Sequence, residues 1–144
     1  MKVTFCGHRN CYNDAEYLNA RLDEVIEKLI SIGANEFMLG NNGQFDHLSA
    51  RAVKRAKGKH PYIRSILVKA YIDENYDREL YDETEYPPIE KTPLRFAISA
   101  RNEYLVNICD VLVSGVKVTF GGAATTREKA IKKKKVIIEL YSEN

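Results

Sequence analysis

A glycine pair followed by two threonines and a glutamate lies near the end of the chain, in the sequence FGGAATTRE. Gly121 and Gly122 allow a backbone to approach a ligand without obstruction from a Cβ atom. The N–H groups at the start of the following helix, together with the positive end of its dipole, attract an anion. Thr125 and Thr126 add hydroxyl donors, and Glu128 lies in the first turns of that helix. The spacing predicts a phosphate-binding loop; the alternative is a glycine turn and a threonine helix cap that bind nothing.

Two further glycine turns follow strand-like segments. The first is GHRN after KVTFC, and the second is GNNG after EFML. Their candidate ligand-binding residues are Gly7, His8, Arg9, Gly40, Asn41, Gly43 and Asp46. Asp46 falls in the first turn of the helix after GNNG, where a carboxylate is either a partner of the helix dipole or an acceptor for a ribose hydroxyl.

Apolar runs and helical spacing place these turns between strands and helices. Strands are predicted at residues 2–6, 36–39, 65–71, 111–113 and 136–140, and helices between residues 14 and 33, at 44–57, at 96–108 and from the glycine pair to 134. Strands joined by right-handed helical crossovers form a sheet that is covered on both faces. We therefore predict one domain over residues 1–144, an α/β Rossmann-like three-layer sandwich whose five-stranded, mainly parallel sheet has the order 3-2-1-4-5.

In this fold the three glycine turns share the edge where the strands end. The first and fourth strands lie on either side of the point where the strand order reverses, and ligands bind open α/β sheets at such a point. The turns are therefore expected to converge on one crevice, which favours a ligand site over three unrelated turns.

An acidic segment at residues 72–93 interrupts the alternation of strands and helices. It contains eight acidic residues and three prolines and has no sustained periodicity. It is longer than an ordinary connection, so it is either a lid over the crevice or an insertion without a role in binding.

The composition is that of a globular domain, with 44% hydrophobic and 29% charged residues. No apolar run approaches the roughly 20 residues that span a bilayer, and the first residues lack the features of a signal peptide, so we expect a cytoplasmic protein without a membrane partner. Cys6, His8 and Cys11 lack a fourth ligand for a zinc site, and we expect neither a metal nor another cofactor.

A net charge of +2 is too small to indicate a nucleic-acid partner. Basic residues at 54–60 and 132–135 could form a surface for a nucleic-acid backbone, but the acidic segment weighs against this hypothesis. We expect self-association, which the many tyrosines favour, although the sequence fixes no number of subunits.

Four motifs together resemble the SLOG superfamily. They are GHR, GNNGQFD, RNEYL with an aspartate at residue 110, and GGAATTRE. The resemblance covers essentially the whole chain and also supports self-association. The stretch TPLRFAISARNEYLV is most similar to the small YpsA-like branch, whose members are Rossmann-like and are thought to bind nucleotide-derived ligands. LOG-type phosphoribohydrolases and the Rossmann-like domains of DprA proteins are related families.

The resemblance implies a nucleotide or nucleotide-derived ligand with a sensory or regulatory role, its phosphates on the Gly-Gly loop and the helix N-terminus. It also implies an alternative function, in which Glu128 and Arg101 match the catalytic pair of the phosphoribohydrolases and the protein cleaves the N-glycosidic bond of a nucleoside 5′-monophosphate. Ala124 replaces the third glycine of that motif, and the segment between Asp110 and Gly121 is longer than the resemblance predicts.

Overall fold

A computed structural model of the protein describes residues 1–142. The strands are β1 (Lys2–Gly7), β2 (Glu36–Leu39), β3 (Arg64–Val68), β4 (Glu83–Glu85), β5 (Val111–Gly115) and β6 (Val136–Glu139). The helices are α1 (Ala15–Ser31), α2 (Gln44–Lys59), α3 (Ala97–Ile108) and α4 (Gly122–Lys132), with short 3-10 helices η1 (Tyr12–Asp14) and η2 (Leu94–Phe96) before α1 and α3. None of the helices in residues 1–142 is long and apolar enough to cross a membrane.

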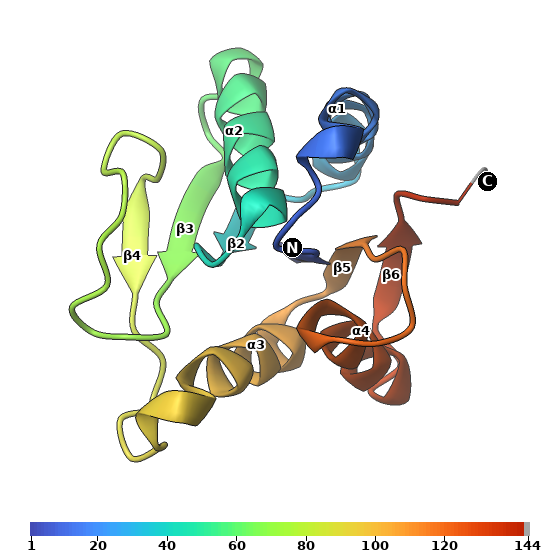
Figure 1. Cartoon of the computed structure of the whole chain (residues 1–144). Coiled ribbons are helices and arrows are strands. Elements are labelled where there is room, and N and C mark those ends of the chain that lie inside the picture. The colour runs from blue at the N-terminus through green and yellow to red at the C-terminus, as the bar shows by residue number, and fades with distance from the viewer. Residues whose placement is uncertain (143–144) are drawn as a thin grey trace.

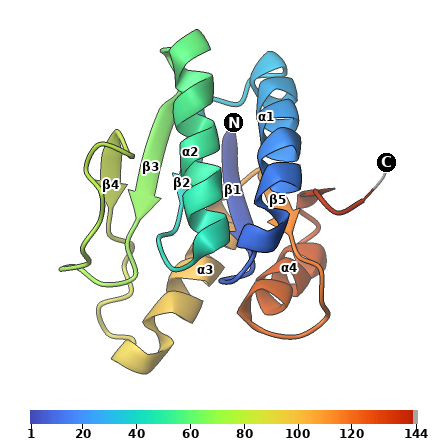
Figure 2. The same cartoon turned by 45° about the horizontal axis from the view of Figure 1, so that its top comes forward.

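The strands form one parallel sheet between two layers of helices. Within the described residues the order is β4-β3-β2-β1-β5-β6, with every neighbouring pair parallel. Helices α1 and α2 cover one face, and α3 and α4 cover the other (Figure 1). The predicted α/β Rossmann-like fold is confirmed. The five strands and their order were slightly wrong, because β4 adds a sixth strand at the edge beyond β3 (Figure 2).

Strand β4 lies inside the acidic segment and has the sequence Glu-Thr-Glu. Three residues with two charges show no apolar alternation, so no strand is predicted there. Strand β4 nevertheless pairs in parallel with β3, and ion pairs accompany this pairing. Arg64 of β3 donates from Nε to Glu83 of β4 at 2.6 Å and from Nη1 to Glu36 of β2 at 2.7 Å. This part of the segment is therefore an edge strand.

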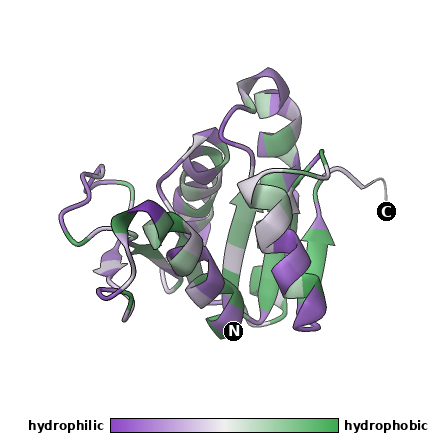
Figure 3. Cartoon of the chain, turned by 60° about the horizontal axis from the view of Figure 1, so that its bottom comes forward, coloured by the Kyte–Doolittle hydropathy of each residue, from purple (hydrophilic) through white to green (hydrophobic). Residues whose placement is uncertain are grey.

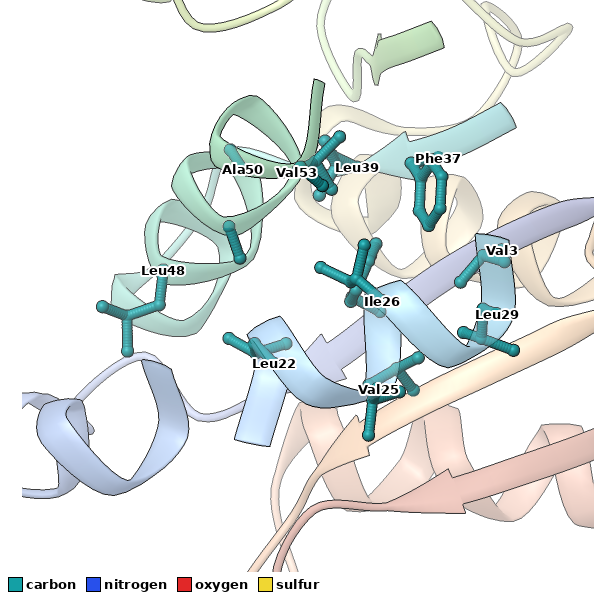
Figure 4. Close-up of a cluster of buried hydrophobic side chains, with 14 of the residues drawn as sticks. Val3, Leu22, Val25, Ile26, Leu29, Phe37, Leu39, Leu48, Ala50 and Val53 are labelled. Atoms are coloured by element: carbon teal, nitrogen blue, oxygen red, sulfur yellow. The ribbon is translucent and has the colours of Figure 1, made fainter. Parts of the chain in front are cut away.

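Strand side chains alternate between two apolar layers. Phe37 belongs to the cluster that contains Leu22 and Ile26 of α1 (Figure 4), whereas Met38 packs with Leu105 of α3. The central strands β2, β3 and β5 are accordingly largely apolar, whereas many polar residues lie on the helices (Figure 3). Burial on both faces is what a parallel sheet between helices requires, and it fixes the strand ends relative to one another.

Several elements end a few residues from their predicted limits. Strand β3 ends at Val68 rather than at residue 71, and α2 continues to Lys59 rather than to residue 57. Strands β1 and β5 both continue to a glycine, and these two residues, Gly7 and Gly115, are partners in the sheet.

Candidate functional site

A cavity of about 190 Å³ lies at the carboxyl end of β1, the strand that pairs with β5. The chain leaves β1 toward β2 and leaves β5 toward β6, so the strand order reverses here, and such a point is where open α/β sheets bind ligands. Its lining includes these residues named from the sequence: Gly7, His8, Arg9, Gly43, Asp46, Arg101, Gly122 and Thr126. The three glycine turns therefore meet, and α3 contributes to the same cavity.

The paired glycines at the ends of β1 and β5 make room for an aromatic ring. A Cβ atom on Gly7 would lie 2.2 Å from Cγ of Phe45, and one on Gly115 would lie 2.3 Å from its Cε1. Phe45 is the second residue of α2 and is fully buried. The two glycines thus let α2 begin directly above the strand ends.

The start of α2 is bonded to the loop after β1. The N–H groups of Gln44 and Phe45 donate to the carbonyls of Arg9 (3.0 Å) and His8 (3.3 Å). The Gln44 side chain in turn accepts the N–H of Cys11 at 2.6 Å. These first helical donors are used within the protein, so the GNNG turn shapes the cavity wall more than it offers N–H groups to a ligand.

Gly40 and Asn41 do not line the cavity. A Cβ atom on Gly40 would lie 3.0 Å from Cζ of Arg101, so this glycine makes room for the guanidinium. Asn41 donates to the carbonyl of Asn75 at 3.0 Å and contacts His47 at 3.2 Å through its carbonyl oxygen. Asn41 therefore attaches the acidic segment to α2.

Arg101 is the largest fully buried side chain, with 1% of its surface exposed. Its guanidinium donates to the carbonyl of Val68 and to the side chain of Asn102, both at 2.9 Å, and to the side chain of Asn42. Within residues 1–142 it forms no ion pair within 4.0 Å. Burial lowers the pKa of the Arg101 guanidinium, although the charge of Asp46 opposes this effect. An arginine stays protonated in proteins, so a cation that lacks a direct ion pair among the described residues faces the cavity, with the charge of Asp46 nearby.

Burial disfavours the ionised form of the Asp46 side chain. Burial raises the pKa of its carboxyl above the ordinary value, despite the bond that it accepts from the N–H of Asn42 at 2.8 Å and the nearby charges of Arg101, His47 and Arg9. A perturbed acid in a cavity is a candidate functional group.

We expect Asp46→Asn to be more stable than the wild type at pH 7. Because the pKa of Asp46 is raised by folding, its contribution to stability is largest at low pH and is lost as the pH rises through the folded-state pKa. The amide keeps an acceptor for Asn42 without the cost of a buried charge. The difference in stability between Asp46→Asn and the wild type should vanish below a pH of about 4, near the ordinary pKa of aspartate. Urea unfolding of both proteins at pH 3.5 and pH 7 measures this, and a difference independent of pH would exclude ionisation as its cause.

Helix α4 points an uncapped N-terminus at the cavity. Gly121 has a φ of 95°, a conformation that favours glycine, and no side chain of residues 1–142 caps the helix. The first N–H groups of α4 are therefore open at Gly122 and Ala123, which line the cavity. Ala124 has no positive φ, so its methyl group causes no backbone strain within α4.

The helical register separates the two threonines. The hydroxyl of Thr125 donates to the carbonyl of Gly121 and that of Thr126 to the carbonyl of Gly122, each at 3.0 Å. Thr126 is buried against the cavity, whereas Thr125 is exposed. Glu128 lies on the exposed side as well: 59% of its side chain is accessible, and within residues 1–142 its ion partner is Arg127 at 3.5 Å. Of the pair Arg101 and Glu128, the structure brings only the arginine to the cavity.

The loop after β1 supplies two more polar groups. Nε2 of His8 accepts the N–H of Lys117 at 2.8 Å, which places the ring proton on Nδ1 and links this loop to the one after β5. Arg9 lines the cavity with an exposed side chain, and in the described part of the chain its guanidinium has neither a hydrogen bond nor an ion pair. It is a second cation available to a ligand.

Cys6 also lines the cavity but is chemically inert. Burial raises the pKa of its thiol to about 12, so almost no thiolate forms at neutral pH. Within residues 1–142 no three His, Cys, Asp or Glu side chains are grouped so that they could hold a metal ion.

Sequence analysis missed Asn42, Asn102 and Phe45. The two asparagines hold the Arg101 guanidinium, and Phe45 fills the space above the strand ends. Asn42 was detectable as a member of GNNG, and Asn102 as the neighbour of Arg101. The part played by Phe45 depends on the pairing of Gly7 with Gly115, which only the sheet register reveals.

No protein-family model and no curated protein sequence matches the chain. Among solved structures it is similar to DNA processing protein A (DprA) from Streptococcus pneumoniae, with a TM-score of 0.70 and 19% identity over 96% of this chain and 49% of that one. DprA from Helicobacter pylori has a TM-score of 0.64 and 16% identity over 96% and 64%. The molybdenum cofactor carrier protein from Chlamydomonas reinhardtii has a TM-score of 0.60 and 15% identity over 96% and 73%.

The chain thus spans about half of the first DprA structure and less than two thirds of the second. At such identities the likeness concerns the fold, and it does not single out the YpsA-like branch. The chain therefore has the Rossmann-like fold that its resemblance to the SLOG superfamily implies.

Proposed function

We propose that the protein binds a nucleotide or nucleotide-derived ligand through a phosphate group and has a sensory or regulatory role. The observation that carries this proposal is the Arg101 guanidinium, which is buried, faces the cavity and has no ion pair among the described residues. Burying a charge without a direct ion pair is costly, and a bound anion would offset the cost. The uncapped start of α4, at Gly122, lines the same cavity and favours an anion for an independent reason.

The other polar groups suit the rest of a nucleotide. Asp46 lines the cavity and would accept hydrogen bonds from sugar hydroxyls, and Arg9 would pair with a second phosphate or cover the first. The residues proposed for binding are Gly7, His8, Arg9, Gly43, Asp46, Arg101, Gly122 and Thr126. Gly40 and Asn41 support the cavity wall. Gly121 has the positive φ that leads the chain into α4, and the Thr125 hydroxyl donates to the carbonyl of Gly121.

Hydrolysis of an N-glycosidic bond is the second candidate. Arg101 is in place to hold the phosphate, but the exposed Glu128 is outside the cavity lining. An oxocarbenium-like transition state needs a carboxylate beside the sugar. Only Asp46 among the lining residues carries one, so we favour binding without cleavage.

The structural relatives suggest other partners. One is named as a molybdenum cofactor carrier, and the Helicobacter pylori protein is described as binding single-stranded DNA. We expect a small molecule rather than a nucleic-acid strand here, since the net charge is only +2. Self-association and a cytoplasmic location remain predictions, and light scattering of the purified protein tests the first.

A thermal-shift screen tests the proposal with AMP, ADP, ATP, NAD, ADP-ribose and cyclic dinucleotides. A ligand that binds only the folded state raises the melting temperature by mass action. We expect at least one to stabilise the wild type and not Gly122→Asp, because an added carboxylate repels the phosphate. A Cβ atom at position 122 meets open space, so the variant should fold.

Gly122→Asn is the matched control, being equal in size to Gly122→Asp but uncharged, and it should retain part of the shift. Chromatography of each stabilising mixture then separates the two functions. An intact ligand supports binding alone, whereas free base with ribose 5-phosphate would establish hydrolysis. No shift with any of the nucleotides would contradict the proposed function.

A further inference from the structure

We propose that Phe120 stacks on the base of the bound nucleotide, so that the site selects base-bearing ligands over sugar phosphates alone. This inference rests on the proposed function and names a residue outside the cavity lining. Phe120 is 74% exposed and lies two residues before Gly122, which lines the cavity. An aromatic ring that is this exposed beside a polar cavity offers a flat apolar surface to a ligand.

The side chain of Phe120 is largely exposed. In the described residues it has no ring contact and no cation over it. Phe96 precedes α3 on the other side of the cavity, where Ile98 belongs to the lining, but the guanidinium of Arg95 lies 4.7 Å from its ring centroid. Phe120 is therefore more exposed than Phe96, and within residues 1–142 no cation lies over its ring.

The loop that carries Phe120 is held at its base and exposed beyond it. Lys117 bonds through its N–H to His8 at 2.8 Å and through Nζ to Asp14 at 2.9 Å, and Nζ also lies 5.3 Å from the ring centroid of Tyr141. Residues 118–122 are all exposed. Phe120 thus sits on a short exposed loop whose base is bonded to the loop after β1 and to η1.

The distance to the phosphate site suits a nucleotide. Consecutive Cα atoms are about 3.8 Å apart, so the Cα atoms of Phe120 and Gly122 are at most about 7.6 Å apart. A phosphate at the first N–H groups of α4 would place a ribose across this interval and the base near the ring. The cavity of about 190 Å³ then encloses the sugar phosphate, and the base lies at its mouth.

A tryptophan reporter tests the contact directly, because the chain contains no tryptophan. In Phe120→Trp the new indole is the only one, and stacking of a base should quench its fluorescence. We expect AMP to quench it and ribose 5-phosphate to leave it unchanged. Tyr62→Trp is the control. Tyr62 is 63% exposed and lies in the loop between α2 and β3, at the amino end of β3, whereas the cavity lies at the carboxyl ends of the strands. Quenching of both variants alike, or of neither under saturating AMP, would overturn the inference.

Affinities of AMP and ribose 5-phosphate complete the test. Stacking of one base on an aromatic side chain strengthens binding by roughly 5- to 100-fold. Phe120→Ala should weaken AMP binding by about that factor and leave ribose 5-phosphate binding unchanged, and Tyr62→Ala should change neither. If both ligands bind and the ratio of their affinities is unaltered in Phe120→Ala, only the stacking inference fails. If neither binds the wild type, the proposed function fails as well.

Discussion

Replacing Arg101 with methionine is expected to weaken AMP binding by about 100-fold, because removing one partner of a buried charge pair costs several kcal/mol. Methionine keeps most of the side-chain volume but neither the charge nor the donors. The free energy of unfolding should fall by about 1–3 kcal/mol, since acceptors on Val68, Asn42 and Asn102 lose their donor. Calorimetric titration and urea unfolding measure the two effects separately.

Two variants show whether charge alone explains the loss. Arg51→Met removes an exposed arginine from α2 and should leave AMP affinity almost unchanged. Arg101→Lys keeps the charge at position 101 but not the planar fork that reaches three acceptors, so it should recover only part of the affinity. Wild-type affinity in Arg101→Met would show that the buried guanidinium has a structural role only.

The second large effect is expected from Gly115→Ala, which should lower the free energy of unfolding by about 1–3 kcal/mol or more. The added methyl would lie 2.3 Å from Cε1 of Phe45 and 2.8 Å from two further ring atoms. Phe45 is fully buried and cannot move aside without moving the start of α2. Because Asp46 lies beside it on α2, nucleotide affinity should fall together with stability.

A double-mutant cycle isolates the contact between Gly115 and Phe45. Phe45→Leu replaces the ring with a smaller side chain. Gly115→Ala should therefore lower the free energy of unfolding by less in this background, so that the two effects are non-additive. Gly58→Ala is the control within α2: a Cβ atom there meets open space, and the change should stabilise the protein by up to about 1 kcal/mol. Strict additivity would mean that the two residues do not share this space.

Patterns local in sequence were sufficient for most of the fold. Apolar runs bounded by glycine turns predicted five strands, and the alternation with helices predicted a parallel sheet. Strand β4 was missed because its three residues lack apolar alternation, while the contacts of this strand are distant in sequence: it pairs with β3, and Arg64 bonds to glutamates that are 28 and 19 residues away. Ion pairs between neighbouring strands have no local signature.

The candidate site was predicted in outline, because three glycine turns at one sheet edge had to converge. The role of each glycine was not predictable, since sequence does not show what fills the space beside it. Gly7 accommodates Phe45, and Gly40 accommodates Arg101. The helical register of α4 decided the rest: Thr126 faces inward, while Thr125 and Glu128, three residues apart, share the exposed side.

Calorimetric titration of the wild-type protein with AMP and with adenosine tests the anion site most directly. The two probes differ only in the phosphate, which is the group assigned to Arg101 and the start of α4. We expect AMP to bind and adenosine to bind at least about 100-fold more weakly, since the charged contacts of the phosphate are worth several kcal/mol. Equal affinity for the two probes would contradict the proposed phosphate site.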